Sequence, residues 1–232
     1  MSSNFLSGVT QAAESNPLGS FVIPDPTACH TWFDDFDDYV AAEWTITEVG
    51  SGTRAVGDLD GGVLVVTNAA ADNDHNYLQW SGATNAATVE TWKFEAGKRF
   101  WFKARLKISD ATESDAFMGL YVTDTDPIGA IIDGVYFHKT DGSTTCNLVV
   151  AASSTATTTA VATLADDTYV TLAFFYDGID KFEAYLNDNR VANSVATNMP
   201  STELALSFAI QNGAGAAKSM SIDYIFVSKA RD

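Results

Sequence analysis

The chain has 232 residues, of which 30 are acidic and 13 basic, so its formal net charge is −17. Hydrophobic residues make up 46% and aromatic residues 12%, enough for a packed core, which excludes a chain that is disordered throughout. The negative charge makes attraction to nucleic acid or to an anionic membrane unfavourable, and no apolar run is long enough to cross a bilayer, so we expect neither partner.

Residues 1–30 are predicted to form an extended arm. Pro17, Pro24 and Pro26 fall in this segment, and proline favours extended backbone in its neighbours. The segment lacks the basic and apolar regions of a secretory signal, so synthesis in the cytoplasm is expected. It carries too many large apolar groups for a solvated tail, and they show no sustained alternation. We expect the arm to lie on its own domain or on a neighbouring subunit, with a disordered leader as the alternative. The residues expected to bind a partner are Phe5, Leu6, Leu18, Phe21 and Ile23.

Residues 31–232 are predicted to form one domain of β-strands. Apolar residues alternate with polar or small ones in several runs, which places one face on a core and the other toward water or a partner. The clearest runs are Phe100–Ile108, Val170–Tyr176, Phe182–Leu186, Leu204–Ile210 and Met220–Phe226. In the last run, Met220, Ile222, Tyr224 and Phe226 are assigned to a single face.

Turn residues separate these runs. Asp177-Gly178 predicts a hairpin between two of them, and Asp141-Gly142 and Asn212-Gly213 mark further turns. The Thr- and Ala-rich residues 151–163 favour an edge hairpin over a helix. About a dozen strands at short spacing, without convincing amphipathic helices, predict an all-β fold, an antiparallel two-sheet β-sandwich or jelly roll.

Four stretches resemble the concanavalin A-like lectin/glucanase superfamily. They are the opening FDDF at Phe33–Phe36, KRFWFKARLKI at Lys98–Ile108, YDG followed by FEAYLND, and the last strand IDYI at Ile222–Ile225. The resemblance covers roughly residues 32–230 and rests on strand order and hairpin style. It implies a lectin-like jelly roll whose members include glycosidases, sugar-binding modules and structural units.

The whole chain, including its Pro-Asp-Pro arm, also resembles structural proteins of tailed bacteriophages. This second resemblance implies a virion component on the capsid surface, made in the host cytoplasm. Its partners would be the major capsid protein or other virion proteins, and repeated sites on a shell would favour a homo-oligomer.

Catalytic motifs are absent from the sequence. Glucanases of the superfamily carry paired carboxylates on one strand as E-x-D-x-x-E, and no such motif occurs. The histidines are His30, His75 and His138, and no G-x-S-x-G accompanies them. His138, in VYFHK, is expected to face a sheet surface. We therefore predict no catalytic residues and a protein that is not an enzyme.

No cofactor is predicted, and the metal content is left open. The run Asp72-Asn73-Asp74-His75-Asn76 offers oxygen ligands that Ca²⁺ accepts, but it lacks the full loop spacing with a later glutamate, and a polar turn is the preferred interpretation. By resemblance only, Asp223 and one aspartate of residues 34–38 are candidates for a structural Ca²⁺. Cys29 and Cys146 are interpreted as independent thiols.

A basic stripe is the most informative local feature. Six of the 13 basic residues fall within 15 positions: Lys93, Lys98, Arg99, Lys103, Arg105 and Lys107. Trp101 shares a face with Lys103, Arg105 and Lys107, which makes this face a candidate surface for a partner or a glycan. The alternative is that the stripe pairs with acidic residues on adjacent strands. Trp80, Trp92 and Tyr121 could also hold a sugar if they face outward.

The function we predict from the sequence is structural. The chain would decorate or cement a phage capsid, with its arm laid across neighbouring subunits. The first alternative is a carbohydrate-binding module for adhesion to host or environmental glycans. The second is a glycoside hydrolase with an unrecognised site, which would need two carboxylates facing each other across a sheet.

Overall fold

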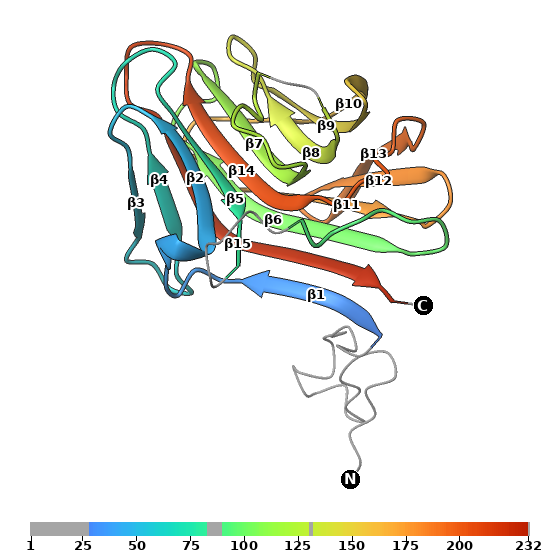
Figure 1. The fold of residues 1–232 in the computed structure, drawn as a ribbon. Coiled ribbons are helices and arrows are strands. Elements are labelled where there is room, and N and C mark those ends of the chain that lie inside the picture. Colours follow the sequence, from blue (N-terminus) through green and yellow to red (C-terminus); the bar gives the residue numbers. More distant parts are fainter. Residues whose placement is uncertain (1–27, 83–89, 130–131, 232) are drawn as a thin grey trace, which may run out of the picture.

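A computed structural model describes residues 28–82, 90–129 and 132–231. These residues form two antiparallel β-sheets packed face to face, and the helical element among them is the 3-10 turn η2 (Ala41–Glu43) (Figure 1). The predicted all-β sandwich is therefore confirmed. None of the helices in these ranges has the length and apolar character needed to cross a membrane.

The eight-stranded sheet has β6 and β15 near its centre. Its order is β13 (Asn189–Val195), β12 (Lys181–Leu186), β11 (Val170–Tyr176), β6 (Phe100–Ile108), β15 (Ser219–Ala230), β4 (Leu64–Thr67) and β3 (Thr53–Val56). An eighth strand, β1 (Cys29–Asp34), pairs with the second half of β15, with Cys29 opposite Ala230. The hairpin predicted at Asp177-Gly178 joins β11 to β12.

The seven-stranded sheet has β7 and β14 near its centre. Its order is β10 (Thr155–Thr163), β9 (Thr145–Ala152), β8 (Gly134–Lys139), β7 (Ser114–Tyr121), β14 (Ala205–Asn212), β5 (His75–Trp80) and β2 (Trp44–Val49). The Thr-rich segment forms the edge hairpin β9–β10, as predicted, and turns at Ser153 and Ser154, which both have positive φ.

The core lies between the sheets and is rich in aromatic rings. Phe100 and Phe102 of β6 are fully buried, and Phe102 stacks on Phe174 of β11 with ring centroids 5.1 Å apart. Their alternation with exposed or half-buried neighbours follows the predicted period of two. Burial of each such ring stabilises the fold by about 1.5–3 kcal/mol relative to an exposed one.

A β-bulge in β15 changes which face its side chains occupy. The register with β6 shifts between Ile222 and Tyr224, so Asp223 is an extra residue in the strand. Ile225 and Val227 consequently enter the core, while Tyr224 and Phe226 point outward. The prediction that Tyr224 and Phe226 share a face with Met220 and Ile222 is therefore wrong.

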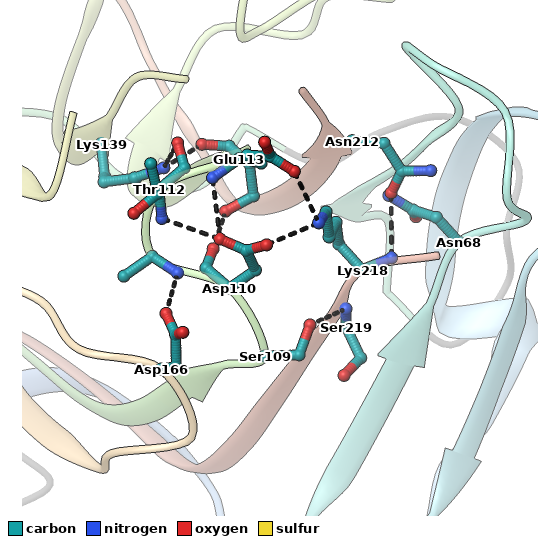
Figure 2. A network of polar contacts seen from close by, with 12 residues as sticks. Asn68, Ser109, Asp110, Thr112, Glu113, Lys139, Asp166, Asn212, Lys218 and Ser219 are labelled. Atoms are coloured by element: carbon teal, nitrogen blue, oxygen red, sulfur yellow. Dashed lines mark hydrogen bonds and ion pairs between the residues drawn. The ribbon is translucent and has the colours of Figure 1, made fainter. Parts of the chain in front are cut away.

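A polar network joins the loop after β6 to the loop before β15 (Figure 2). The Lys218 ammonium lies 2.6 Å from Asp110 and 3.6 Å from Glu113. The backbone N–H of Lys218 donates to Asn212 Oδ1, and Asn68 donates to the same oxygen. Lys218, Asn212 and Asn68 are buried, and the network provides their polar groups with partners where the sheets meet the loops.

Candidate functional site

The outer face of the seven-stranded sheet carries a second set of ordered side chains. Alternation within each strand turns Asp115, Phe117, Gly119 and Tyr121 of β7 away from the core. The strand pairing then places Asp115 beside Gln211, Phe117 beside Ala209 and His138, and Ala209 beside Tyr77. These are outward positions of four neighbouring strands, so their side chains form one surface.

Tyr77 is at the centre of a hydrogen-bond chain on this face. Its hydroxyl donates to Gln211 Oε1 at 2.8 Å and lies 3.4 Å from Asp126 Oδ1. Gln211 Nε2 in turn donates to Asn73 Oδ1 at 3.1 Å. Burial, followed by the charge of Asp126, raises the pKa of Tyr77 well above its usual value. The phenol therefore stays protonated and acts as a donor.

Asp126 reaches this cluster from the loop between β7 and β8. Its Oδ1 accepts the backbone N–H of Gly129 at 3.0 Å. A Cβ on Gly129 would lie 2.2 Å from Asp126 Oδ2, so a side chain at that position would displace the carboxylate. Asp126 itself is exposed, and its carboxylate is therefore held beside Tyr77 at a surface open to solvent.

Asp115 and His138 lie on the neighbouring strands β7 and β8. Asp115 Oδ1 accepts the backbone N–H of Asp141 at 2.9 Å. Burial lowers the pKa of His138, although the charge of Asp115 opposes the shift, so the imidazole is neutral at pH 7. Its Nε2 is buried and makes no hydrogen bond within the described part of the chain. His138 faces the sheet surface, as predicted.

The loop after β7 covers part of the face. Asp124 N–H donates to Gln79 Oε1 at 3.0 Å, and Gln79 Nε2 donates to Val122 O at 3.1 Å. At its far end, Ile132 N–H donates to the Tyr121 hydroxyl. The loop buries Tyr121 completely, so the expectation that Tyr121 could face a sugar is not met. The accessible groups lie at the end of the face that this loop does not cover, where Asp115, Gln211 and His75 are half-buried.

No strand at the centre of this face carries two outward carboxylates. On β7 the outward positions provide Asp115 alone, and on β8 they are Gly134, Tyr136 and His138. The spaced carboxylates of a glucanase strand are therefore missing, as the sequence indicated. Asp126 is a carboxylate that a loop, and not a strand, brings to Tyr77 on this face.

The part of the basic stripe on β6 lies in the other sheet, and its three cations are paired. Lys103 contacts Asp188 at 2.6 Å, Lys107 contacts Asp167 at 3.3 Å, and Arg105 forms an ion pair with Asp223. Arg105 also lies over the ring of Tyr169 at 4.3 Å from its centroid. These pairs agree with the alternative that the stripe pairs with acidic residues of the same chain. Trp101 is 36% exposed, and its predicted role in binding a partner or a glycan stays a prediction.

The remaining predicted residues fall into three groups. The arm residues Phe5, Leu6, Leu18, Phe21 and Ile23 lie outside the described residues. Trp92 is buried, and Trp80 packs edge-on against Trp32 and Trp44. Among the described residues, no three His, Cys, Asp or Glu side chains converge into a metal-binding group. Cys29 and Cys146 are separate free thiols, as interpreted.

Sequence reasoning missed Tyr77, Gln211, Asp115 and Asp126 as a group. The alternation of His75, Tyr77 and Gln79 with Asn76 and Leu78 along β5 was a usable signal for a polar outward face. Asp126 gave no such signal, because only the path of the loop brings it to Tyr77.

The sequence matches no protein-family model, and no curated protein matches it. Among solved structures, Bacillus licheniformis β-glucanase superposes with a TM-score of 0.60 at 13% identity, covering 85% of this chain and 97% of that one. A Bacteroides ovatus GH16 protein from a mixed-linkage glucan locus, in complex with its product, superposes with a TM-score of 0.58 at 14% identity. The match covers 84% of this chain and 99% of that one. A native glycosidic hydrolase superposes with a TM-score of 0.59 at 11% identity, covering 85% of this chain and 94% of that one.

These similarities overturn one prediction. The expectation that the chain is not an enzyme rested on missing motifs, whereas these three structures, which it resembles along most of their length, are glycoside hydrolases. A missing motif on one strand does not exclude carboxylates supplied by a loop. The chain has the concanavalin A-like jelly-roll fold that those β-glucanases share.

Proposed function

We propose that this chain acts on a polysaccharide at the outer face of its seven-stranded sheet. One observation carries the proposal: the hydrogen-bonded chain Gln211–Tyr77–Asp126 lies beside Asp115 on the outer face of a sandwich with a glycosidase-like fold. The glucanases that share the fold support a carbohydrate as the ligand.

The chemistry of the face suits glycoside hydrolysis. That reaction needs one carboxyl group to protonate the leaving oxygen and one carboxylate to act as base or nucleophile. The Tyr77 hydroxyl contacts Asp126 Oδ1 at 3.4 Å, and the backbone N–H of Asp141 donates to Asp115 Oδ1 at 2.9 Å, so both carboxyl groups are held in place at the face. Asp126 and Asp115 are therefore assigned as the two carboxyl groups of the reaction.

The groups around the two carboxylates suit a sugar ring. Gln211 is half-buried at the accessible end of the face and offers an amide to ring hydroxyls. His75 stacks on Tyr77 with ring centroids 4.0 Å apart and an interplanar angle of 9°. This pair gives the site a rigid flank, because each ring restrains the other.

The test is release of reducing ends from barley mixed-linkage β-glucan, xylan and amylose. We expect the wild-type chain to release product from at least one of them. Asp126→Asn and Asp115→Asn should each lower the rate by about 10²-fold or more, because each removes a carboxylate used in proton transfer. Tyr77→Phe should cause a smaller loss, since it removes a donor and leaves both carboxylates.

Asp60→Asn is the matched control, because Asp60 is an exposed carboxylate in the loop before β4. Its rate should equal that of the wild type. Unchanged product release in both Asp126→Asn and Asp115→Asn would show that these carboxylates do not perform the reaction. Absence of product from every polysaccharide in the panel would refute hydrolysis of these substrates.

We also propose that a phage particle carries this domain on its capsid surface. The support is the sequence of residues 1–30, whose apolar residues suit contact with a neighbouring subunit. Mass spectrometry of purified particles tests it, and absence of the chain from them would refute the virion role. A particle-borne domain and a polysaccharide-directed site are compatible, because they involve different parts of the chain.

A further inference from the structure

The outer face of the eight-stranded sheet contains an open hollow of about 340 Å³. We call it the aromatic hollow, and its walls are Trp101, Lys103, Phe175, Glu183, Tyr185 and Phe226. These side chains come from β6, β11, β12 and β15, which are adjacent in the sheet. It lies on the opposite side of the sandwich from the Tyr77 cluster.

The small side chain of Ala173 creates the depression. In the strand register, Ala173 lies between Lys103 of β6 and Tyr185 of β12, and Lys103 lies beside Phe226 of β15. Each of these neighbours extends several carbon atoms further from the sheet than a methyl group does. Phe226 reaches this face only because the bulge at Asp223 reverses the alternation of β15.

The aromatic part of the hollow is partly accessible. Trp101 is 36% exposed, and its ring packs on Phe175 with centroids 5.1 Å apart and an interplanar angle of 38°. Phe175, Tyr185 and Phe226 are half-buried. An exposed tryptophan supported by a second ring provides a flat apolar surface that can hold the C–H face of a sugar.

The charged groups of the hollow are already neutralised. Lys103 contacts Asp188 at 2.6 Å. Glu183 accepts the Tyr185 hydroxyl at 2.6 Å and forms ion pairs with Lys181 at 2.7 Å and Arg190 at 3.0 Å. A charged ligand therefore has no unpaired opposite charge to bind here. A neutral ligand with hydroxyl groups can still donate hydrogen bonds to the carboxylate oxygens of Glu183.

The sheet leaves no place for an added peptide strand. β6, β11, β12 and β15 are all hydrogen-bonded to neighbours on both sides, so the ligand has to bind through side chains. A purely apolar ligand would cover Lys103 and Glu183 without offering them hydrogen bonds, which is unfavourable. The requirements left are an apolar face, hydroxyl groups and no net charge.

We propose that the aromatic hollow is a second carbohydrate-binding surface, which holds the pyranose rings of a neutral polysaccharide. The choice of a carbohydrate rests in part on the proposed function, but the site itself is separate from Tyr77 and its neighbours. Its role is to retain the polymer while the other face acts on it.

The test is affinity electrophoresis through gels that contain barley mixed-linkage β-glucan, amylose or polygalacturonate. We expect one neutral polymer to retard the wild-type chain and the anionic polygalacturonate not to. Trp101→Ala should weaken binding and raise the dissociation constant about tenfold, because the stacking surface is lost. Ala173→Leu should weaken binding similarly by filling the hollow, while all of the aromatic residues remain in place.

Two controls separate this site from the proposed catalytic face. Leu59→Ala removes an exposed apolar side chain far from the hollow and should bind like the wild type. Asp126→Asn should lose product release and keep its retardation, so failure of hydrolysis and failure of the hollow give different results. Circular dichroism and thermal unfolding of each variant establish that it is folded.

Three results would overturn the proposal. The first is equal retardation of the wild type, Trp101→Ala and Ala173→Leu. The second is retardation by polygalacturonate alone. The third is binding of a synthetic peptide of residues 1–27 that Ala173→Leu abolishes, with no retardation by any polymer, which would assign the hollow to the chain's own leading segment.

Discussion

Removal of the Asp110 carboxylate should destabilise the fold in a pH-dependent way. Asp110 Oδ1 accepts the backbone N–H groups of Thr112 at 2.9 Å and Glu113 at 2.8 Å, and Oδ2 accepts from the Lys218 ammonium at 2.6 Å (Figure 2). The Lys218 side chain is only 6% exposed, so its charge depends on this partner. These bonds lower the pKa of Asp110 from 3.8 to about 2.

The size of the effect follows from that shift. A fall of nearly two units would correspond to about 2.4 kcal/mol at 1.36 kcal/mol per unit. The Asp110 side chain is 26% exposed, and Glu113 lies 3.6 Å from Lys218 as a second acceptor. Solvent screening and that substitute partner reduce the expected loss in Asp110→Asn to about 1–2 kcal/mol at pH 7.

The sign of the pH dependence is fixed. The pKa of Asp110 is lower in the folded state than in the unfolded state. Its contribution to the free energy of unfolding is therefore complete above pH 3.8, the pKa in the unfolded state. It declines as the pH falls and is lost near pH 2. The free-energy difference between the wild type and Asp110→Asn should therefore shrink toward zero at about pH 2.

Urea unfolding followed by tryptophan fluorescence measures this difference at pH 7 and at about pH 2.5. Asp60→Asn, at an exposed position, controls for the change in net charge. Equal stability of Asp110→Asn and the wild type at pH 7 would refute the stabilising role of this carboxylate. A difference in the free energy of unfolding that is as large at the acidic pH as at the neutral one would refute it too.

The remaining predictions concern backbone packing and thiol reactivity. Gly119→Ala should lower the free energy of unfolding by about 2 kcal/mol or more, because the added Cβ would lie 2.5 Å from Tyr136 Cα. Gly215→Ala is the control and should be nearly neutral, because the atom nearest to its added Cβ is 3.9 Å away. Equal urea midpoints for the two variants would contradict this prediction. Complete burial raises the pKa of Cys146 to about 12. Iodoacetamide should therefore label Cys29 first and Cys146 only when the chain unfolds. Equal labelling rates of the two cysteines in the folded chain would show that the Cys146 thiol is accessible.

Alternation in the sequence was sufficient to predict the fold class. The run Phe100–Ile108 shows why: every second side chain, from Phe100 to Ile108, is buried, and the residues between them, Trp101 included, face outward, as the period of two requires. The turn at Asp177-Gly178 was equally readable, because Gly178 has a φ of 84° that other residues adopt only with strain.

Residues whose position depends on a single extra residue or on a loop could not be placed. The bulge at Asp223 moves Phe226 into the aromatic hollow, and the apolar Ile225 and Val227 around it fit either register. Asp126 joins Tyr77 because the loop folds back over the sheet, which no local pattern encodes. Both candidate sites therefore depend on departures from regular alternation.

The pairing of β1 with β15 has a mechanical consequence. Cys29 and Ala230 face each other at the same end of two antiparallel strands. A force that pulls these two points apart would act on one hydrogen-bonded pair at a time and peel the strands open, whereas strands loaded from opposite ends resist with all of their bonds together. If the domain is tethered through both ends, it should yield at low force from this edge inward while the rest of the sandwich stays intact.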